Sequence, residues 1–198
     1  KAMLKIIQAD GVAERRQIAD MRARAAQTGE GINATAAAVL KDVREGGYEA
    51  VERYSVQFDK AVPREISKEE VEAAYAACPK ELIEAMETAA ANIRDYNEKL
   101  LLRTMEWKNP AGGTVGRIVR GLTRVGIYVP GGTAAYPSSV LMNAVPAKVA
   151  GVQEIIMVTP ATENLNQAVL AAAKIAGVDR VIGVGGIQAI AALTYGAG

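Results

Sequence analysis

The sequence predicts a mixed α/β protein in which an N-terminal helical unit precedes a parallel-sheet unit, and two contrasts along the chain carry that prediction. Residues 1–120 hold 38 charged side chains, whereas residues 121–198 hold only 7. Glycine is distributed the other way, because 11 of the 19 glycines lie in residues 121–198. A charge-rich segment with helical periodicity indicates solvated helices, and a charge-poor segment interrupted by glycine indicates a buried parallel sheet with covering helices.

The first part of the chain is predicted to form three helices, over residues 12–27, 34–45 and 48–58. We expect Gly29, Gly31 and the pair Gly46-Gly47 to lie at or near the ends of these helices, because glycine favours helix termini.

Two further helices are predicted before residue 105. The motif Ser67-Lys68-Glu69-Glu70 is a capping box, so a helix begins ahead of Val71. The longest helix is expected from Pro79 to about Leu102. Its apolar residues recur at alternating steps of four and three, and they are Leu82, Met86, Ala89, Ile93, Tyr96 and Leu100. This seam is either a face of the protein's own core or a subunit interface.

A hairpin is predicted to link the two units. The turn sequence Asn109 to Gly113 separates two short extended pieces, residues 104–107 and 114–120. We therefore divide the chain into a helical N-terminal unit (1–105), a hairpin linker (106–120) and an α/β unit (121–198).

Three β-branched runs define the α/β unit, and they are residues 124–129, 154–159 and 180–184. Each is followed by a proline or glycine turn and then a helical pattern. Strands that alternate with helices predict a parallel sheet with right-handed crossovers. A parallel sheet of three strands with open edges is incomplete, so we expect more strands from residues beyond Gly198 or from another chain.

Composition excludes several classes of function. The 23 basic and 22 acidic side chains nearly cancel, which argues against nucleic acid or an anionic membrane as a partner. Apolar runs fall short of the ~20 residues that span a bilayer. The N-terminus has no signal-peptide core and Cys78 is the lone cysteine, so a cytoplasmic protein is predicted. The chain has no histidine, which rules out a Ser-His-Asp triad, a Cys-His pair or a histidine-rich zinc site. We therefore assign neither catalytic nor metal-binding residues to it.

The carboxyl ends of the three strands are the candidate binding edge, because ligands of open parallel sheets bind there. The segments at this edge are Tyr128 to Gly132, Thr159-Pro160 and Gly185 to Gln188. Paired glycines allow close approach of a ligand, and Gln188 offers a donor and an acceptor to an amide or a ribose. Neither GxGxxG after the first strand nor GxxxxGK[ST] is present. Tight turns without a ligand are the alternative.

The stretch RVGIYVPGGTAAYPSSVLMNAVPAKVAGVQEIIMVTP, residues 124–160, closely resembles histidinol dehydrogenase, as do VGGIQAIAALTYGAG at 184–198 and AGVDRV at 176–181. The resemblance implies a zinc-dependent enzyme of histidine biosynthesis that oxidises L-histidinol through the aldehyde to L-histidine, with two hydride transfers to NAD. It also implies an aldehyde-dehydrogenase-like architecture, in which residues 121–198 form part of a Rossmann-like parallel α/β/α domain, and a homodimer whose active site uses both subunits.

Carried onto this sequence, the resemblance places NAD contacts on Tyr128 and Gln188, and we group with them the adjoining turn residues Pro130, Gly131 and Gly132. Asn97 and Ile187 depart from the family pattern, which has His and Ala at the corresponding places.

The family's zinc ligands and catalytic Glu-His pair correspond to positions beyond residue 198. We therefore expect the 198-residue chain to be an N-terminal portion that is inactive alone. A non-catalytic nucleotide-binding or assembly module derived from the same family is the alternative.

Overall fold

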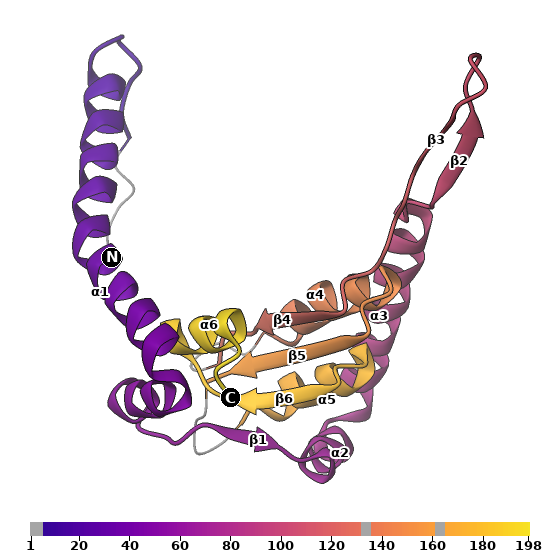
Figure 1. Cartoon of the computed structure of the whole chain (residues 1–198). Coiled ribbons are helices and arrows are strands. Elements are labelled where there is room, and N and C mark those ends of the chain that lie inside the picture. Colours follow the sequence, from indigo (N-terminus) through magenta and orange to yellow (C-terminus); the bar gives the residue numbers. More distant parts are fainter. Residues whose placement is uncertain (1–5, 132–135, 161–164) are drawn as a thin grey trace.

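The computed structural model describes residues 6–131, 136–160 and 165–198, and of residues 25–30 it describes only the backbone. A four-stranded sheet lies at the centre with helices on both faces, and two long arms project from this body (Figure 1). One arm is the N-terminal part of α1 (Ala13–Phe58), and the other is the hairpin of β2 (Met105–Lys108) and β3 (Thr114–Arg117).

The central sheet has the strand order β1-β6-β5-β4. The three predicted strands, β4 (Arg124–Tyr128), β5 (Glu154–Thr159) and β6 (Arg180–Gly183), are present and parallel. β1 (Arg64–Ile66) pairs antiparallel with β6 and was not predicted, because a strand of three residues is too short to show an alternating pattern. The edge of the sheet beside β6, which we expected to be open, is therefore occupied by a strand from the helical part of the chain.

Helices cover each face of the sheet. One face packs against α2 (Lys68–Ala77), α3 (Lys80–Leu100), α4 (Pro137–Val149) and α5 (Gln167–Ala176). The other face packs against α6 (Gly186–Tyr195) and the second half of α1. Ile155 and Met157 of β5 point into the first layer and Val158 into the second, and all three are buried. This alternation follows from the two-residue period of a strand buried on both faces.

The first two predicted helices are one continuous helix. α1 runs through Gly29 and Gly31 without interruption, so the expected breaks there were wrong. A glycine inside a helix costs only about 1 kcal/mol relative to alanine, which long helical flanks can outweigh. The break at Gly46-Gly47 is confirmed, because Gly47 has φ 58° and ψ −141° and separates two helical stretches.

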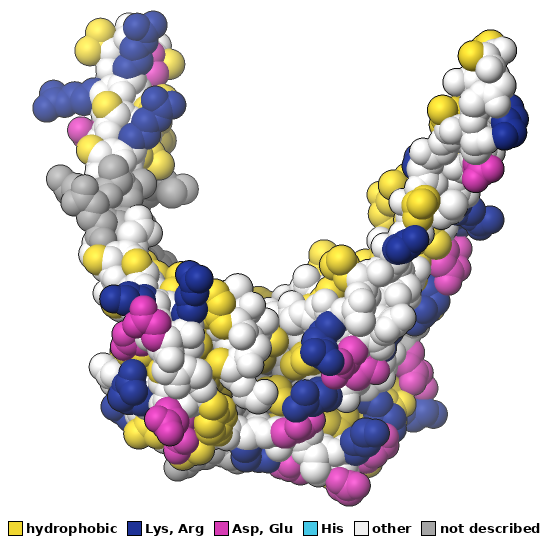
Figure 2. Space-filling view, viewed as in Figure 1, with side chains coloured by type: hydrophobic (Ala, Val, Ile, Leu, Met, Phe, Trp, Pro, Cys, Tyr) yellow, Lys and Arg dark blue, Asp and Glu magenta, His cyan; other side chains and the backbone are white. Residues whose placement is uncertain are grey.

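The apolar seam of α3 divides into two parts. Leu82, Met86, Ala89 and Ile93 pack into the core, whereas Tyr96 and Leu100 are 64% and 59% exposed. The first part of the seam is thus a face of the protein's own core. The second part continues towards the hairpin arm, in which Met105, Trp107 and Val115 are also exposed. The space-filling view shows hydrophobic side chains on the surface of both arms (Figure 2).

Asp179 joins three elements at the amino end of the sheet. Its Oδ2 accepts hydrogen bonds from Lys148 Nζ at 2.7 Å and from the backbone N–H of Ile155 at 2.7 Å. Partial burial raises the pKa of this carboxyl, but the ion pair with Lys148 and the Ile155 N–H outweigh burial and hold the pKa below its ordinary value of 3.8.

We predict that Gly47→Ala lowers the free energy of unfolding by about 1–3 kcal/mol, because L residues rarely adopt this backbone conformation. Gly31→Ala is the matched control, since an added Cβ there meets no atom within 4 Å and alanine favours the helix. Urea denaturation should show opposite shifts for the two variants. Equal stability of Gly47→Ala and the unaltered chain would contradict the prediction.

We also predict that Asp179→Asn loses about 1 kcal/mol of stability at neutral pH, the effect being limited by 38% exposure of the side chain. A lowered carboxyl pKa contributes stability above the ordinary value of 3.8, and that contribution disappears as the pH falls through the lower pKa of the folded state. The gap in urea midpoint between the variant and the unaltered chain should therefore close in acid. Glu84→Gln, which breaks an exposed pair with Lys80, should change little at any pH.

Candidate functional site

The carboxyl ends of β4, β5 and β6 meet around Pro160. The ladder continues past the strands, because Val129 N–H donates to Val158 O at 2.9 Å and Val184 N–H donates to Thr159 O at 2.8 Å. A Cβ built on Gly185 would lie 2.7 Å from Cγ of Pro160, and one built on Gly131 would lie 3.2 Å from its Cδ. Because Gly131 after β4 and Gly185 after β6 have no side chain, both turns can pack closely on Pro160, which lies between them.

Tyr128 connects the end of β4 to the first turn of α6. Its side chain is half-buried, and its Oη accepts a hydrogen bond from the backbone N–H of Gly186 at 3.3 Å. The two residues are 58 positions apart in the sequence. The parallel topology thus brings two of the predicted ligand-binding segments into contact.

Gln188 lies in the first turn of α6 and is fully buried. Its Nε2 donates a hydrogen bond to Asp59 Oδ2 at 3.0 Å, so the donor that we expected a ligand to use is already engaged. Its Oε1 is also buried and has no hydrogen-bond partner among the residues that the structure describes. Such an atom is rare in folded proteins, since a buried polar group without a partner costs about 1–3 kcal/mol.

Asp59 is the residue of this edge that sequence reasoning missed. It follows the last residue of α1, and its Oδ2 accepts from Gly185 N–H at 3.3 Å as well as from Gln188. A carboxylate is well placed at the start of α6, because free N–H groups and the helix dipole favour a negative charge there. Nothing in the sequence around Asp59 indicated these partners, which are 126 and 129 positions away.

Two of the remaining predicted residues, Pro130 and Gly131, come just after β4. Pro130 is exposed and Gly131 is half-buried. Gly132 lies outside the described residues.

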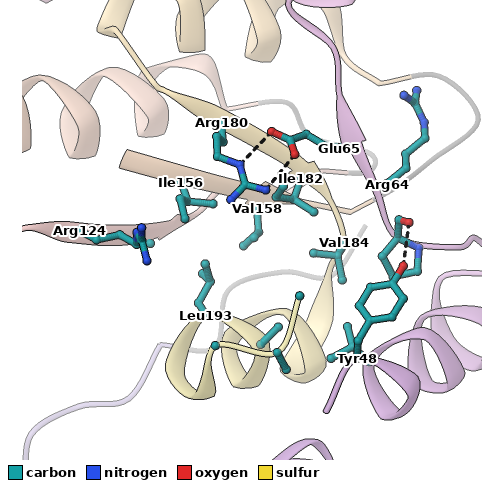
Figure 3. A pocket seen from close by; sticks show the side chains of 17 residues that line it. Tyr48, Arg64, Glu65, Arg124, Ile156, Val158, Arg180, Ile182, Val184 and Leu193 are labelled. Carbon is teal, nitrogen blue, oxygen red and sulfur yellow. Dashed lines mark hydrogen bonds and ion pairs between the residues drawn. The ribbon is translucent and has the colours of Figure 1, made fainter. Parts of the chain in front are cut away.

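A separate cavity of about 430 Å³ opens on the sheet face beside α6 (Figure 3). Apolar residues including Ile156, Ile182 and Leu193 line it. Two arginines at its rim are paired with carboxylates, Arg180 with Glu65 at 2.8 Å and Arg124 with Glu154. Neither Tyr128 nor Gln188 lines this cavity, so it is not part of the candidate site.

The described residues offer neither a cluster of metal ligands nor a membrane-spanning helix. No group of three or more acidic or cysteine side chains gathers as metal ligands within residues 6–131, 136–160 and 165–198, and the sequence has no histidine. The described residues therefore do not fit a zinc site. No helix in the described part of the chain is long and apolar enough to cross a membrane.

We predict that Gly185→Ala destabilises the protein by about 1–3 kcal/mol, because the added methyl group would overlap the ring of Pro160. Pro160→Ala removes most of that ring, so the double variant should recover part of the loss. Denaturation of the two single variants and the double variant measures the coupling. Strictly additive effects would show that the two residues do not press on each other.

A family model described as histidinol dehydrogenase matches residues 22–198 of this chain. The histidinol dehydrogenase of Streptococcus mutans is 48% identical over 167 residues, which cover 83% of this chain and 39% of that protein. That of Clostridium acetobutylicum is 43% identical over 198 residues, covering 98% of this chain and 46% of that protein.

Solved structures agree. The crystal structure of histidinol dehydrogenase from Elizabethkingia anophelis superposes with a TM-score of 0.78 at 34% sequence identity, covering 84% of this chain and 39% of that one. The chain thus spans less than half the length of the relatives that it matches. Because the family model extends over most of the sequence and the fold agrees with a solved member, the chain belongs to the histidinol dehydrogenase family.

Proposed function

We propose that this chain is the N-terminal portion of a histidinol dehydrogenase and supplies part of its NAD site. The reaction is the oxidation of L-histidinol to L-histidine through the aldehyde, in histidine biosynthesis. One observation supports the site above all others: in a chain of this family, Tyr128 and the buried Gln188 carbonyl oxygen, which has no hydrogen-bond partner among the described residues, both lie at the carboxyl edge of the parallel sheet.

The proposed roles follow from these contacts. Tyr128 presents a half-buried ring against which a flat heterocycle can pack. Gln188 Oε1 would accept a hydrogen bond from the cofactor, which would satisfy an atom that no described residue binds. Pro130 and Gly131 follow Tyr128 directly in the chain, and we group them with the site together with Gly132, which lies outside the described residues. When bound, NAD supplies the hydride acceptor for both oxidations.

The zinc ion of the family has no fitting ligands in the described residues, and we derive no step through it. We propose that its ligands and the acid-base groups lie in the part of the relatives that this chain does not cover. The proposed architecture is a helical unit (1–105), a hairpin linker (106–120) and a Rossmann-like, aldehyde-dehydrogenase-like unit (121–198). We propose in addition that the protein is a homodimer and lies in the cytoplasm.

The second candidate is a non-catalytic nucleotide-binding or assembly module of the same family. The exposed apolar residues of α3 and the hairpin, Tyr96, Leu100 and Trp107 among them, favour a protein contact in either case. Reading the coding DNA downstream of codon 198 separates the candidates. An open frame with paired histidines supports the enzyme, and a stop codon supports the module.

We predict that Tyr128→Ala and Gln188→Ala each weaken NAD binding by about 1–2 kcal/mol, or roughly 5- to 30-fold in Kd, because each removes one contact. Histidinol binding should change less. Titration calorimetry of a full-length version with each ligand measures both effects. Tyr96→Ala and Gln167→Ala, at exposed sites elsewhere, are the controls. Unaltered NAD affinity with weakened histidinol binding would show that NAD is the wrong ligand for this edge.

The purified 198-residue chain should form no NADH from histidinol and retain no stoichiometric zinc after dialysis. Hydride abstraction from an alcohol needs a base of suitable pKa near the hydroxyl, and a chain without histidine lacks the usual one. Absorbance of NADH and elemental analysis provide the measurements. Steady turnover, or one tightly held zinc per chain, would refute this assignment of the catalytic groups.

A further inference from the structure

The contacts of Asp59 determine how Gln188 can act. The Asp59 carboxylate lies at the end of α1 and binds two groups of the turn between β6 and α6, the Gly185 N–H and the Gln188 Nε2. These partners are 126 and 129 residues away in the sequence. The residue that follows α1 therefore contacts the turn after β6, which forms part of the proposed cofactor edge.

A carboxylate accepts hydrogen bonds and has none to donate, whereas a glutamine amide has an accepting oxygen on one side and a donating NH₂ on the other. The two orientations of the amide are consequently unequal beside Asp59. With the NH₂ towards Asp59, a charge-assisted hydrogen bond forms. With the oxygen towards Asp59, two acceptors would face each other. Asp59 thus selects the orientation in which the Gln188 carbonyl oxygen points away from it.

The oxygen so selected lies beside the residue that Tyr128 contacts. A Cβ built on Gly186 would be only 2.6 Å from Gln188 Oε1, and the N–H of the same glycine donates to Tyr128 Oη at 3.3 Å. Because Tyr128 Oη accepts that bond, its own hydrogen is available to a ligand. Gly186 has φ 64°, a conformation that suits glycine, and a side chain there would collide with the amide.

We infer that Asp59 is a positioning residue: it fixes the amide of Gln188 with the carbonyl oxygen turned away from Asp59 and beside Gly186, so that any group that binds this oxygen is a hydrogen-bond donor. This inference rests on the proposed function for its ligand, NAD, which carries amide, amine and hydroxyl donors. The positioning itself rests on the contacts of Asp59 alone.

The test uses the intact chain with Asp59→Leu, which keeps the approximate shape and removes both acceptors, and Asp59→Asn, which keeps one oxygen acceptor. Asp42→Leu is the matched control, because Asp42 lies on the same helix and binds Tyr54 Oη instead. Hydrogen exchange followed by NMR reports on the Gly185 amide and the Gln188 side-chain NH₂. Asp59→Leu should accelerate both by about tenfold or more, whereas Asp59→Asn and Asp42→Leu should stay within about threefold of the unaltered chain. Unchanged exchange in Asp59→Leu would overturn the inference.

NAD titration adds a readout that a purely structural role would not move. Asp59→Leu should raise the NAD Kd about tenfold while Asp59→Asn leaves it nearly unchanged. Equal loss of affinity in both variants, with exchange still protected in Asp59→Asn, would show that orientation of the amide is not what NAD requires. If the unaltered chain binds no NAD, the proposed cofactor site fails for this chain, and the exchange data still decide the role of Asp59.

A swap of the two polar groups keeps the inference testable if Asp59→Leu does not fold. Gln188→Glu alone places two carboxylates together and should weaken NAD binding by about tenfold or more. Adding Asp59→Asn supplies an NH₂ donor to the new carboxylate, which still turns an acceptor oxygen to the ligand. The double variant should therefore recover at least half of the lost binding free energy. A double variant no better than Gln188→Glu would contradict the inferred orientation.

Discussion

Burial of a short parallel sheet on both of its faces is the constraint on which the rest of this structure depends. β5 lies in the middle, and its side chains alternate between two hydrophobic layers, with Ile155 and Met157 on one side and Val158 on the other. Four helices supply the first layer, whereas α6 and the second half of α1 supply the other. Since a parallel sheet exposed on either face would be unstable, the N-terminal helices and the later α/β segment are joined in one body. The strand β1, which comes from the N-terminal part and pairs with β6, has the same effect.

That packing also creates the candidate site. Because α1 packs against α6, the end of α1 places Asp59 at the start of α6. There its carboxylate accepts hydrogen bonds from the Gly185 N–H and the Gln188 Nε2. The same edge receives Tyr128 from β4, while Pro160 at the end of β5 fills the space that the glycines leave. Hydrophobic layering sets the positions of the elements, and a few polar contacts then orient the side chains. Within the described part of the chain, this arrangement leaves the Gln188 carbonyl oxygen without a hydrogen-bond partner.

The two arms project from this body and carry exposed apolar side chains. Every residue of β2 and β3 is exposed, and a two-stranded hairpin alone is marginally stable in water. Ile18 and Met21 on the N-terminal arm and Trp107 on the hairpin add exposed apolar surface. Surface of this kind is typical of parts that contact another polypeptide. The chain covers less than half of its relatives' length.

The sequence by itself determined the features that depend on neighbouring residues. The three parallel strands, the hairpin and the capping box at Ser67 were all predictable, because each is carried by a local pattern of apolar, glycine or polar residues. The topology also predicted that Tyr128 would approach the turn after β6, since parallel strands end at one edge. The continuation of α1 past Gly29 and Gly31 was missed for a local reason, because long helical flanks outweigh two weak residues. Tertiary structure alone decided two things: that residues 64–66 become a strand, and that the donor of Gln188 is bound by Asp59. Both depend on partners more than 100 residues away, and local composition does not encode such contacts.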